Sequence, residues 1–387
     1  MTGTLVRYSE GRILELDGFR ALAVSMVIFE HMVDGWPLPS SATAWMPSIL
    51  RFLLAHGWLG VDLFFVLSGF LITGILVGER DDPRYLKNFY GRRALRILPL
   101  VVVCIFIWWL TYAHPYGRYL LLALIFCANL DVIFHVPTPH GPGVLWSLAV
   151  EEHFYLLWPL AVRVMTRASL LAAAIAIVVL SPPARWLAVS YGISADHVYQ
   201  LSWYRFDGLA VGAILAIWVR SAYFTRCHVW IIVAGWLFLV GLASAVTIPY
   251  GVMQAKTAAA EALRYTQVQG LFGGAMAIAI AYRGSIVLSP MRSNVAQTIA
   301  NLSYCLYLVH LSLGDLYYWT LGRLGIDDTS ALGGTGALVM RATVIICVSL
   351  VIAALSQRYL EGPFMSLRGR FAHKEVNASD SRSKNKF

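Results

Sequence analysis

The sequence predicts an all-α polytopic membrane protein with about ten transmembrane helices and one additional re-entrant or interfacial segment. Of the 387 residues, 58% are hydrophobic and only 13% are charged, which is about half of the ~25% typical of soluble domains. The mean hydropathy is +0.66. A water-soluble globule needs far more charge to cover its surface, so the net charge of +9 does not indicate a nucleic-acid-binding domain.

Apolar runs long enough to cross a bilayer, which takes ~20 residues, recur along the whole chain. They lie at 19–36, 57–78, 97–113, 144–162, 169–181, 203–219, 229–248, 266–282, 296–320 and 338–357. An eleventh apolar run, 119–134, contains Asn129 and Asp131 and ends in a stretch rich in proline and glycine. Whether this run crosses the membrane decides on which side of the membrane every later loop lies.

The distribution of basic residues favours a topology in which 119–134 does not span, because cytoplasmic loops carry an excess of Lys and Arg. With the N-terminus inside, 22 of the 30 Lys and Arg then face the cytoplasm, six of them in 79–96. We therefore predict both termini in the cytoplasm, with a retained first span. Residues 1–370 are expected to form the transmembrane domain, and 371–387 a polar, disordered cytoplasmic tail.

Ionisable side chains inside a span are costly and are candidates for function. His31 lies next to Glu30, about 16 Å from the cytoplasmic end of the first span. Arg20 precedes His31 by eleven residues, about three helical turns, so the two share a helix face with Asp17 one turn below. This arrangement suits a reagent with an anionic head and a long arm. The alternative is a buried histidine bonded to a neighbouring helix, with Arg20 as a membrane anchor.

A basic cluster in 89–99 contains Arg93 and Arg96, one helical turn apart on the cytoplasmic side. Guanidinium groups so placed can grip phosphates. The alternative is anchoring by anionic lipid headgroups.

A second group of polar side chains lies toward the predicted extracytoplasmic end of the fourth span. Ser147 and Glu151 are four residues apart and face one way, and Glu152 follows. These carboxylates need a partner, either a histidine or a substrate hydroxyl; the alternative is a glutamate bonded at the interface. Further candidates by the same reasoning are Asp62, the pair Arg205 and Asp207, and the polar face of Ser303, Tyr307 and His310.

The sequence does not support several kinds of site. The five cysteines show no disulfide or zinc spacing, and we expect no metal. Nucleotide-binding and hydrolase motifs do not occur.

Several motifs together resemble the acyltransferase-3 family of multi-spanning bacterial membrane acyltransferases. They are 16–20 followed by His31, then 60–69, 92–99, 146–155, 303–310 and 359–363. The resemblance implies transfer of an acyl group, most commonly acetyl, from cytoplasmic acyl-CoA to a hydroxyl. The acceptor would be a cell-surface glycan, lipid-linked sugar, macrolide or other small molecule, and the location the bacterial cytoplasmic membrane. We expect no fused SGNH esterase-like domain.

The resemblance also implies that Arg20 and His31 are catalytic motif residues and that Arg93 and Arg96 handle the donor. Together with the spacing, it suggests that His31 acts as general base and that Glu151 or Glu152 orients it. CoA phosphates would rest on Arg93, Arg96 and Arg20, beside Asp17. Direct transfer and an acyl-histidine intermediate both stay open. We expect substrate binding by Asp62, Ser147, Tyr307, His310, Arg205 and Asp207.

Two other functions stay open. A proton-coupled secondary transporter of an anionic or sugar substrate would use His31 and Glu151 as a relay. An inactive scaffold is disfavoured by the intact set of Arg20, His31, Arg93 and Arg96.

Overall fold

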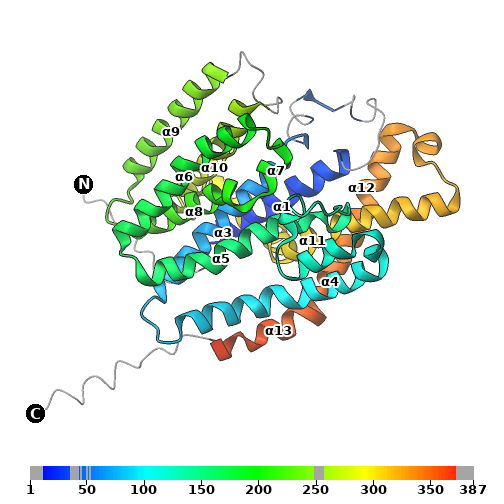
Figure 1. Cartoon of the computed structure of the whole chain (residues 1–387), viewed down its shortest axis with the longest axis horizontal. Helices are drawn as coiled ribbons and strands as arrows, with labels where there is room; N and C mark the ends of the chain where they lie inside the picture. The colour runs from blue at the N-terminus through cyan, green and yellow to red at the C-terminus, as the bar shows by residue number, and fades with distance from the viewer. Residues whose placement is uncertain are drawn as a thin grey trace, which may run out of the picture.

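The chain folds into a bundle of α-helices in the computed structural model (Figure 1), which describes residues 12–34, 43, 46–48, 51, 54–247 and 257–371. Within these residues there is no β-strand, so the predicted all-α class is confirmed. Each of the ten predicted spans coincides with a helix. These helices are α1 (Leu14–Asp34), α3 (Leu59–Gly78), α4 (Tyr85–Leu124), α5 (Leu145–Val164), α6 (Arg167–Ser190), α8 (Phe206–Val219), α9 (Arg226–Thr247), α10 (Ala258–Ala281), α11 (Asn294–Leu324) and α12 (Asp328–Ser356).

Short elements connect or extend these helices. They are η2 (Ala128–Leu130), η3 (Gly141–Val144), α7 (Ala195–Gln200), η4 (Ser202–Tyr204), η6 (Ile286–Arg292), η7 (Gln357–Glu361), α13 (Gly362–Ser366) and η8 (Leu367–Phe371). The backbone carbonyl of Phe371 accepts a hydrogen bond of 2.6 Å from Arg92, so the chain is held against α4 up to this point. The rest of the predicted tail, 372–387, lies outside the described residues.

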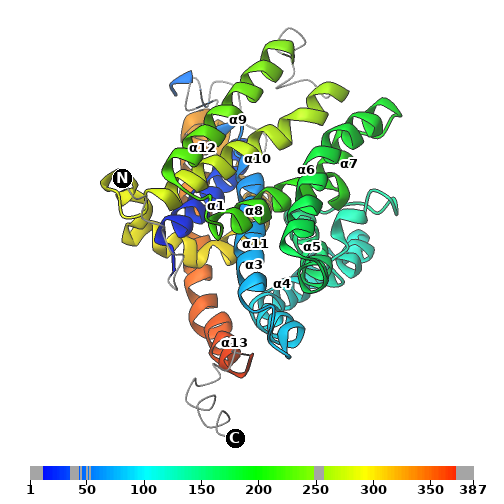
Figure 2. The same cartoon turned by 90° about the vertical axis from the view of Figure 1, so that its left-hand side faces the viewer.

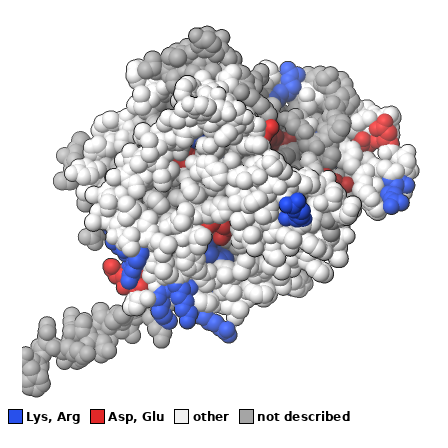
Figure 3. Space-filling view, in the orientation of Figure 1, with Lys and Arg blue, Asp and Glu red and all other residues white. Residues whose placement is uncertain are grey.

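Several helices have the length and composition of membrane spans, as expected for a multi-pass membrane protein. Four described helical segments qualify, or five if α10 and η6, which are bent by 109°, count as one span. Ten crossings and the orientation of the termini stay predictions. The face in Figure 3 is mostly uncharged, and several basic side chains gather at its lower left, toward the end of the bundle where α4 begins.

The segment 119–134 does not form a spanning helix of its own. Helix α4 bends at His114, ends at Leu124 and is followed by the single turn η2. The Tyr119 hydroxyl donates to the carbonyl of Pro142 over 3.2 Å, so the end of α4 packs beside the start of α5. Both helix ends therefore lie at the same end of the bundle, which agrees with the predicted re-entrant or interfacial segment.

Helix α3 runs through the middle of the bundle, with α1 on one side and α5 on the other (Figure 2). Glycines permit its close approach to its neighbours. A Cβ on Gly60 would lie 2.4 Å from the carbonyl oxygen of Ala23 in α1. One on Gly69 would lie 1.9 Å from the carbonyl oxygen of Leu209 in α8. Small residues allow helices to pack closely within a bilayer, where the hydrophobic effect does not drive helices together.

Candidate active site

Three arginines line a cavity of about 110 Å³ between α1, α3, α4, α5 and α11. Arg20 comes from α1, and Arg93 and Arg96 come from successive turns of α4. The guanidinium carbon of Arg93 lies 4.5 Å from the centroid of the Tyr155 ring. Among the described residues, Arg93 and Arg96 have no ion-pair or hydrogen-bond partner. This donor-side cavity, as we call it, therefore offers cationic donors to an anion from outside the chain.

Asp17 does not line the donor-side cavity, although its place in the sequence predicted a contribution to donor binding. Its carboxylate accepts from Nε of Arg12 over 2.5 Å and from Nη1 of Arg20 over 2.9 Å. Asp17 thus holds Arg20 in place. Arg92 likewise turns away from the cavity, since it pairs with Glu79 and with the carbonyl of Phe371.

Glu151 lies in the donor-side cavity and not at His31. It accepts hydrogen bonds from Ser68 over 2.9 Å and from Tyr155 over 2.8 Å. Glu152 lines neither this cavity nor the one described next, and its Oε1 is buried without a hydrogen-bond partner among the described residues. The expectation that Glu151 or Glu152 orients His31 therefore does not fit the geometry, because Glu151 bonds Ser68 and Tyr155 and neither carboxylate lines the cavity of His31.

A second, larger cavity of about 540 Å³ holds His31 and is called here the acceptor-side cavity. Its lining mixes polar, aromatic and apolar side chains and comes from α1, α3, α5, α7, α10, α11 and the segment before α5. The principal side chains are Glu30, His31, Trp58, His140, Trp146, Asp196, Tyr199 and Arg264. Val61 and Tyr307 line both cavities, which therefore meet at these two side chains. The Tyr307 hydroxyl lies 2.6 Å from Oγ of Ser147, so both predicted residues stand at this junction.

The hydrogen bonds of His31 define which of its ring nitrogens is basic. Nδ1 lies 2.8 Å from the carbonyl oxygen of Val27 and 3.2 Å from Nε2 of His310. Nδ1 of His310 in turn lies 2.9 Å from the carbonyl oxygen of Tyr307. Since a carbonyl only accepts, both Nδ1 atoms carry the proton, and Nε2 of His310 accepts from His31. Nε2 of His31 is left as its basic atom.

His310 lines neither cavity and is 0% exposed, which corrects its predicted role in substrate binding. It contacts His31 from the neighbouring helix α11. The spacing of Ser303, Tyr307 and His310 correctly indicated a polar face on this helix, and Ser303 and Tyr307 do line the donor-side cavity.

The predicted pair of Arg205 and Asp207 is wrong. Arg205 pairs with Asp62 over 2.8 Å, and Asp207 pairs with Arg185 over 2.8 Å. The side chains in both pairs are 0% exposed and line neither cavity, so Asp62, Arg205 and Asp207 stabilise the helix packing.

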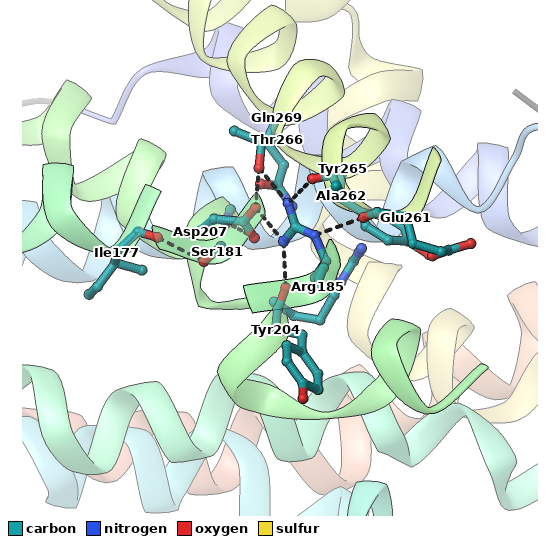
Figure 4. Close-up of polar contacts among 12 residues, drawn as sticks. Ile177, Ser181, Arg185, Tyr204, Asp207, Glu261, Ala262, Tyr265, Thr266 and Gln269 are labelled. Atoms are coloured by element: carbon teal, nitrogen blue, oxygen red, sulfur yellow. Dashed lines mark hydrogen bonds and ion pairs between the residues drawn. The ribbon is translucent and has the colours of Figure 1, made fainter. Parts of the chain in front are cut away.

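Arg185 was missed because it lies beyond the predicted span 169–181, in the part of α6 that continues to Ser190. Figure 4 shows its guanidinium among the carbonyls of Tyr204, Glu261 and Ala262, to which it also donates. A charged side chain late in an apolar helix, three residues after Pro182, was the available signal.

Within the part of the chain that the structure describes, no group of three or more His, Cys, Asp or Glu side chains could hold a metal ion.

The known proteins to which this chain is similar carry related names. The chain is 33% identical over 238 residues to the peptidoglycan O-acetyltransferase OatA of Listeria monocytogenes, covering 55% of this chain and 35% of that protein. It is 33% identical over 174 residues to the O-acetyltransferase OatA of Staphylococcus aureus, covering 40% of this chain and 25% of that protein. The chain thus spans about a third or less of the length of these curated relatives. No solved structure matches it significantly.

The family itself is shown by a match that covers most of the chain. Residues 13–357 match the acyltransferase domain, a range that includes every residue lining the two cavities. The chain therefore belongs to the acyltransferase domain family.

Proposed function

We propose that this protein is an integral membrane O-acyltransferase that transfers an acetyl group from cytoplasmic acetyl-CoA to a hydroxyl of a carbohydrate acceptor. The observation that carries the proposal is the meeting of two unlike cavities at Val61 and Tyr307. One presents three arginines, and the other presents the basic nitrogen of a histidine. Family membership and the names of the relatives, O-acetyltransferases and in one case a peptidoglycan O-acetyltransferase, support the reaction class.

The donor-side cavity suits the anionic head of a CoA thioester. Arg93 and Arg96 make no hydrogen bond or ion pair within the described residues, and Arg20 pairs with Asp17. Glu151 is the one carboxylate of the described residues that lines the same cavity, so its lining carries a net positive charge. Guanidinium groups bind phosphate oxygens by charge-assisted hydrogen bonds. With the phosphates held there, the pantetheine arm extends along α1 and α3 and brings the thioester toward Val61 and Tyr307.

His31 provides the general base for the transfer. Its Nε2 removes the proton of the acceptor hydroxyl as that oxygen attacks the thioester carbonyl carbon. The carbon–sulfur bond then breaks, the proton passes to the CoA sulfur, and the products are an ester and free CoA. His310 acts through His31 as a positioning residue, because it accepts from Nδ1 beside the Val27 carbonyl and orients the ring.

The acceptor-side cavity has the features of a carbohydrate site. The ring centroids of Trp146 and Tyr199 lie 4.6 Å apart, and Trp58 approaches the same tyrosine at 6.4 Å. Such aromatic surfaces cover the apolar faces of sugar rings, while Asp196, Gln200 and Thr138 offer hydrogen bonds to hydroxyls. The transporter alternative gains nothing from this geometry, since His31 and Glu151 bind different partners in different cavities.

The test is acetyl transfer by the purified full chain in detergent, with radiolabelled acetyl-CoA and soluble peptidoglycan fragments. We expect label in the fragments with the wild type and none with His31→Ala, while CoA binding measured by calorimetry is retained. His228→Ala, which removes an exposed histidine outside both cavities, is the matched control and should keep full transfer. Absence of CoA binding by the wild type would contradict the proposal.

A further inference from the structure

A third cavity, of about 380 Å³, lies apart from both cavities of the proposed active site. It is enclosed by the end of α3, the turn into α4, the end of α5, the start of α6 and the end of α8. Three arginines and one carboxylate line it together with four apolar side chains: Arg80, Arg167, Arg220, Asp81, Val77, Val162, Leu170 and Ile217. No lining residue is shared with the donor-side or acceptor-side cavity.

Two of the arginines are fixed by the backbone around them. Arg220 donates to the carbonyl of Ala216 over 2.8 Å, and it lies so close to α3 that a Cβ on Gly74 would be 2.7 Å from its Nη2. The guanidinium of Arg80 donates to the backbone carbonyl of Arg163, and the guanidinium of Arg163 donates to the backbone carbonyl of Arg80. The turn after α3 is therefore tied to the end of α5, and the cavity is held open between them.

The third arginine, Arg167, is not paired with another side chain of the described residues. Arg167 is exposed at the start of α6 and makes no hydrogen bond or ion pair with any residue that the structure describes. Three guanidinium groups and one carboxylate line the cavity, so its lining carries a net positive charge. Each basic residue comes from a different turn between helices, which distinguishes the cavity from a charged face on one helix.

The cavity lies at the end of the bundle that is predicted to face the cytoplasm, where the ends of α3, α5 and α8 meet the starts of α4 and α6. The apolar side chains Val77, Val162, Leu170 and Ile217 come from the last or first turns of these helices. They therefore stand where spanning helices leave the hydrocarbon region, and the arginines stand at headgroup level.

We propose that this cavity is a specific site for the headgroup of an anionic glycerophospholipid, of which phosphatidylglycerol is the representative. Arg167, Arg220 and Arg80 bind the phosphodiester oxygens. Asp81 would repel a second anion but accepts hydrogen bonds from glycerol hydroxyls, which selects a polyol headgroup. The apolar side chains contact the glycerol backbone and the first methylenes of the chains. This site is independent of the proposed acyl transfer.

The experiment uses the full chain in nanodiscs of phosphatidylcholine, with or without phosphatidylglycerol, and measures the midpoint of thermal unfolding. We expect phosphatidylglycerol to raise the midpoint of the wild type. Arg167→Gln should lose most of this rise, because it removes an exposed charge that makes no hydrogen bond or ion pair with the described residues. Arg167→Lys should retain part of it. Arg84→Gln, which removes an exposed charge from the same region outside the cavity, is the matched control and should keep the full rise.

Two outcomes would overturn the proposal. One is an equal rise in Arg167→Gln and Arg84→Gln, which would mean that anionic lipid acts on the charged surface in general. The other appears in an arm with free 3′,5′-ADP or inorganic phosphate in pure phosphatidylcholine. If these raise the midpoint in an Arg167-dependent way and phosphatidylglycerol does not, the cavity binds a soluble phosphate. Both outcomes leave the acetyl-transfer assay unaffected, so they are separate from a failure of the proposed function.

Discussion

Nδ1 of His31 lies 3.2 Å from Nε2 of His310, across the interface between α1 and α11. The contact joins residues that are 279 positions apart, and a backbone carbonyl bonded to each ring defines its tautomer. An imidazole held in this way resembles the base of a hydrolase triad, with a neutral histidine in place of the usual carboxylate. The Val27 carbonyl of α1 therefore keeps the proton of His31 on Nδ1, and the packing of α1 against α11 adds a second acceptor that orients the ring.

Replacement of His310 should lower the turnover number while leaving donor affinity unchanged. The Val27 carbonyl still keeps the proton on Nδ1, but without His310 the ring loses the contact that fixes its orientation, and Nε2 then no longer lies where the acceptor hydroxyl binds. Loss of such a supporting contact costs about 10–100-fold in activity. We expect His310→Ala to lower kcat by this factor with an unchanged KM for acetyl-CoA.

A conservative variant separates this positioning role from a structural one. His310→Gln keeps an acceptor oxygen for Nδ1 of His31, so it should recover a large part of kcat. If His310→Gln and His310→Ala are equally impaired although both retain the wild-type unfolding midpoint, the positioning role is wrong.

Removal of Arg93 or Arg96 should weaken donor binding. A hydrogen bond to a charged group contributes about 1.5–3 kcal/mol, which corresponds to roughly a 10–100-fold rise in Kd. We expect this rise for CoA in Arg96→Gln and in Arg93→Gln, measured by calorimetry on detergent-solubilised protein. Arg92→Gln is the comparison, because Arg92 pairs with Glu79 and Phe371 instead. It should lower the unfolding midpoint and leave the Kd for CoA unchanged; a CoA affinity that depends equally on Arg92 would contradict the assignment.

Residues related by spacing on one helix could be predicted from the sequence, because helix geometry alone brings them together. Arg93 and Arg96 line one cavity as their spacing indicated, and so does Arg20. The relation of His31 to His310 could not be predicted, because it depends on how α1 packs against α11. The partner of Arg205 was misjudged for the same reason: Asp207 is near in sequence, but α3 brings Asp62 to the guanidinium.

The two buried ion pairs, Arg205 with Asp62 and Arg185 with Asp207, predict which charges are energetically coupled in folding. Removing one partner of a buried pair costs about 3–5 kcal/mol, because the other charge stays buried without compensation. Asp62→Asn and Asp207→Asn should therefore each lower the thermal unfolding midpoint strongly. In double-mutant cycles with Arg205→Met and Arg185→Met, coupling should be large for Arg205 with Asp62 and for Arg185 with Asp207. Larger coupling between Arg205 and Asp207 than between Arg205 and Asp62 would contradict the structure.

Close packing of α3 against α8 should make Gly69 intolerant of a side chain. An alanine Cβ there would lie 1.9 Å from the carbonyl oxygen of Leu209, which is backbone and can move only with the whole helix. Overpacking of this kind costs about 1–3 kcal/mol or more. We expect Gly69→Ala to reduce the yield of monodisperse protein in size-exclusion chromatography. Gly235→Ala in α9, where a Cβ meets nothing within 4 Å, should have no effect, and equal yields of the two variants would refute the close approach.

The junction between the two cavities should control transfer without affecting donor binding. Val61 and Tyr307 line both cavities, so a larger side chain at Val61 obstructs the path from the thioester to His31. The arginines that we propose to bind the CoA phosphates are untouched. We expect Val61→Phe to retain the wild-type Kd for CoA and to lose most of the transfer of labelled acetyl groups. Val61→Ala widens the same point and should keep transfer. Unimpaired transfer in Val61→Phe would show that the acyl group reaches the acceptor by a route that does not pass this junction.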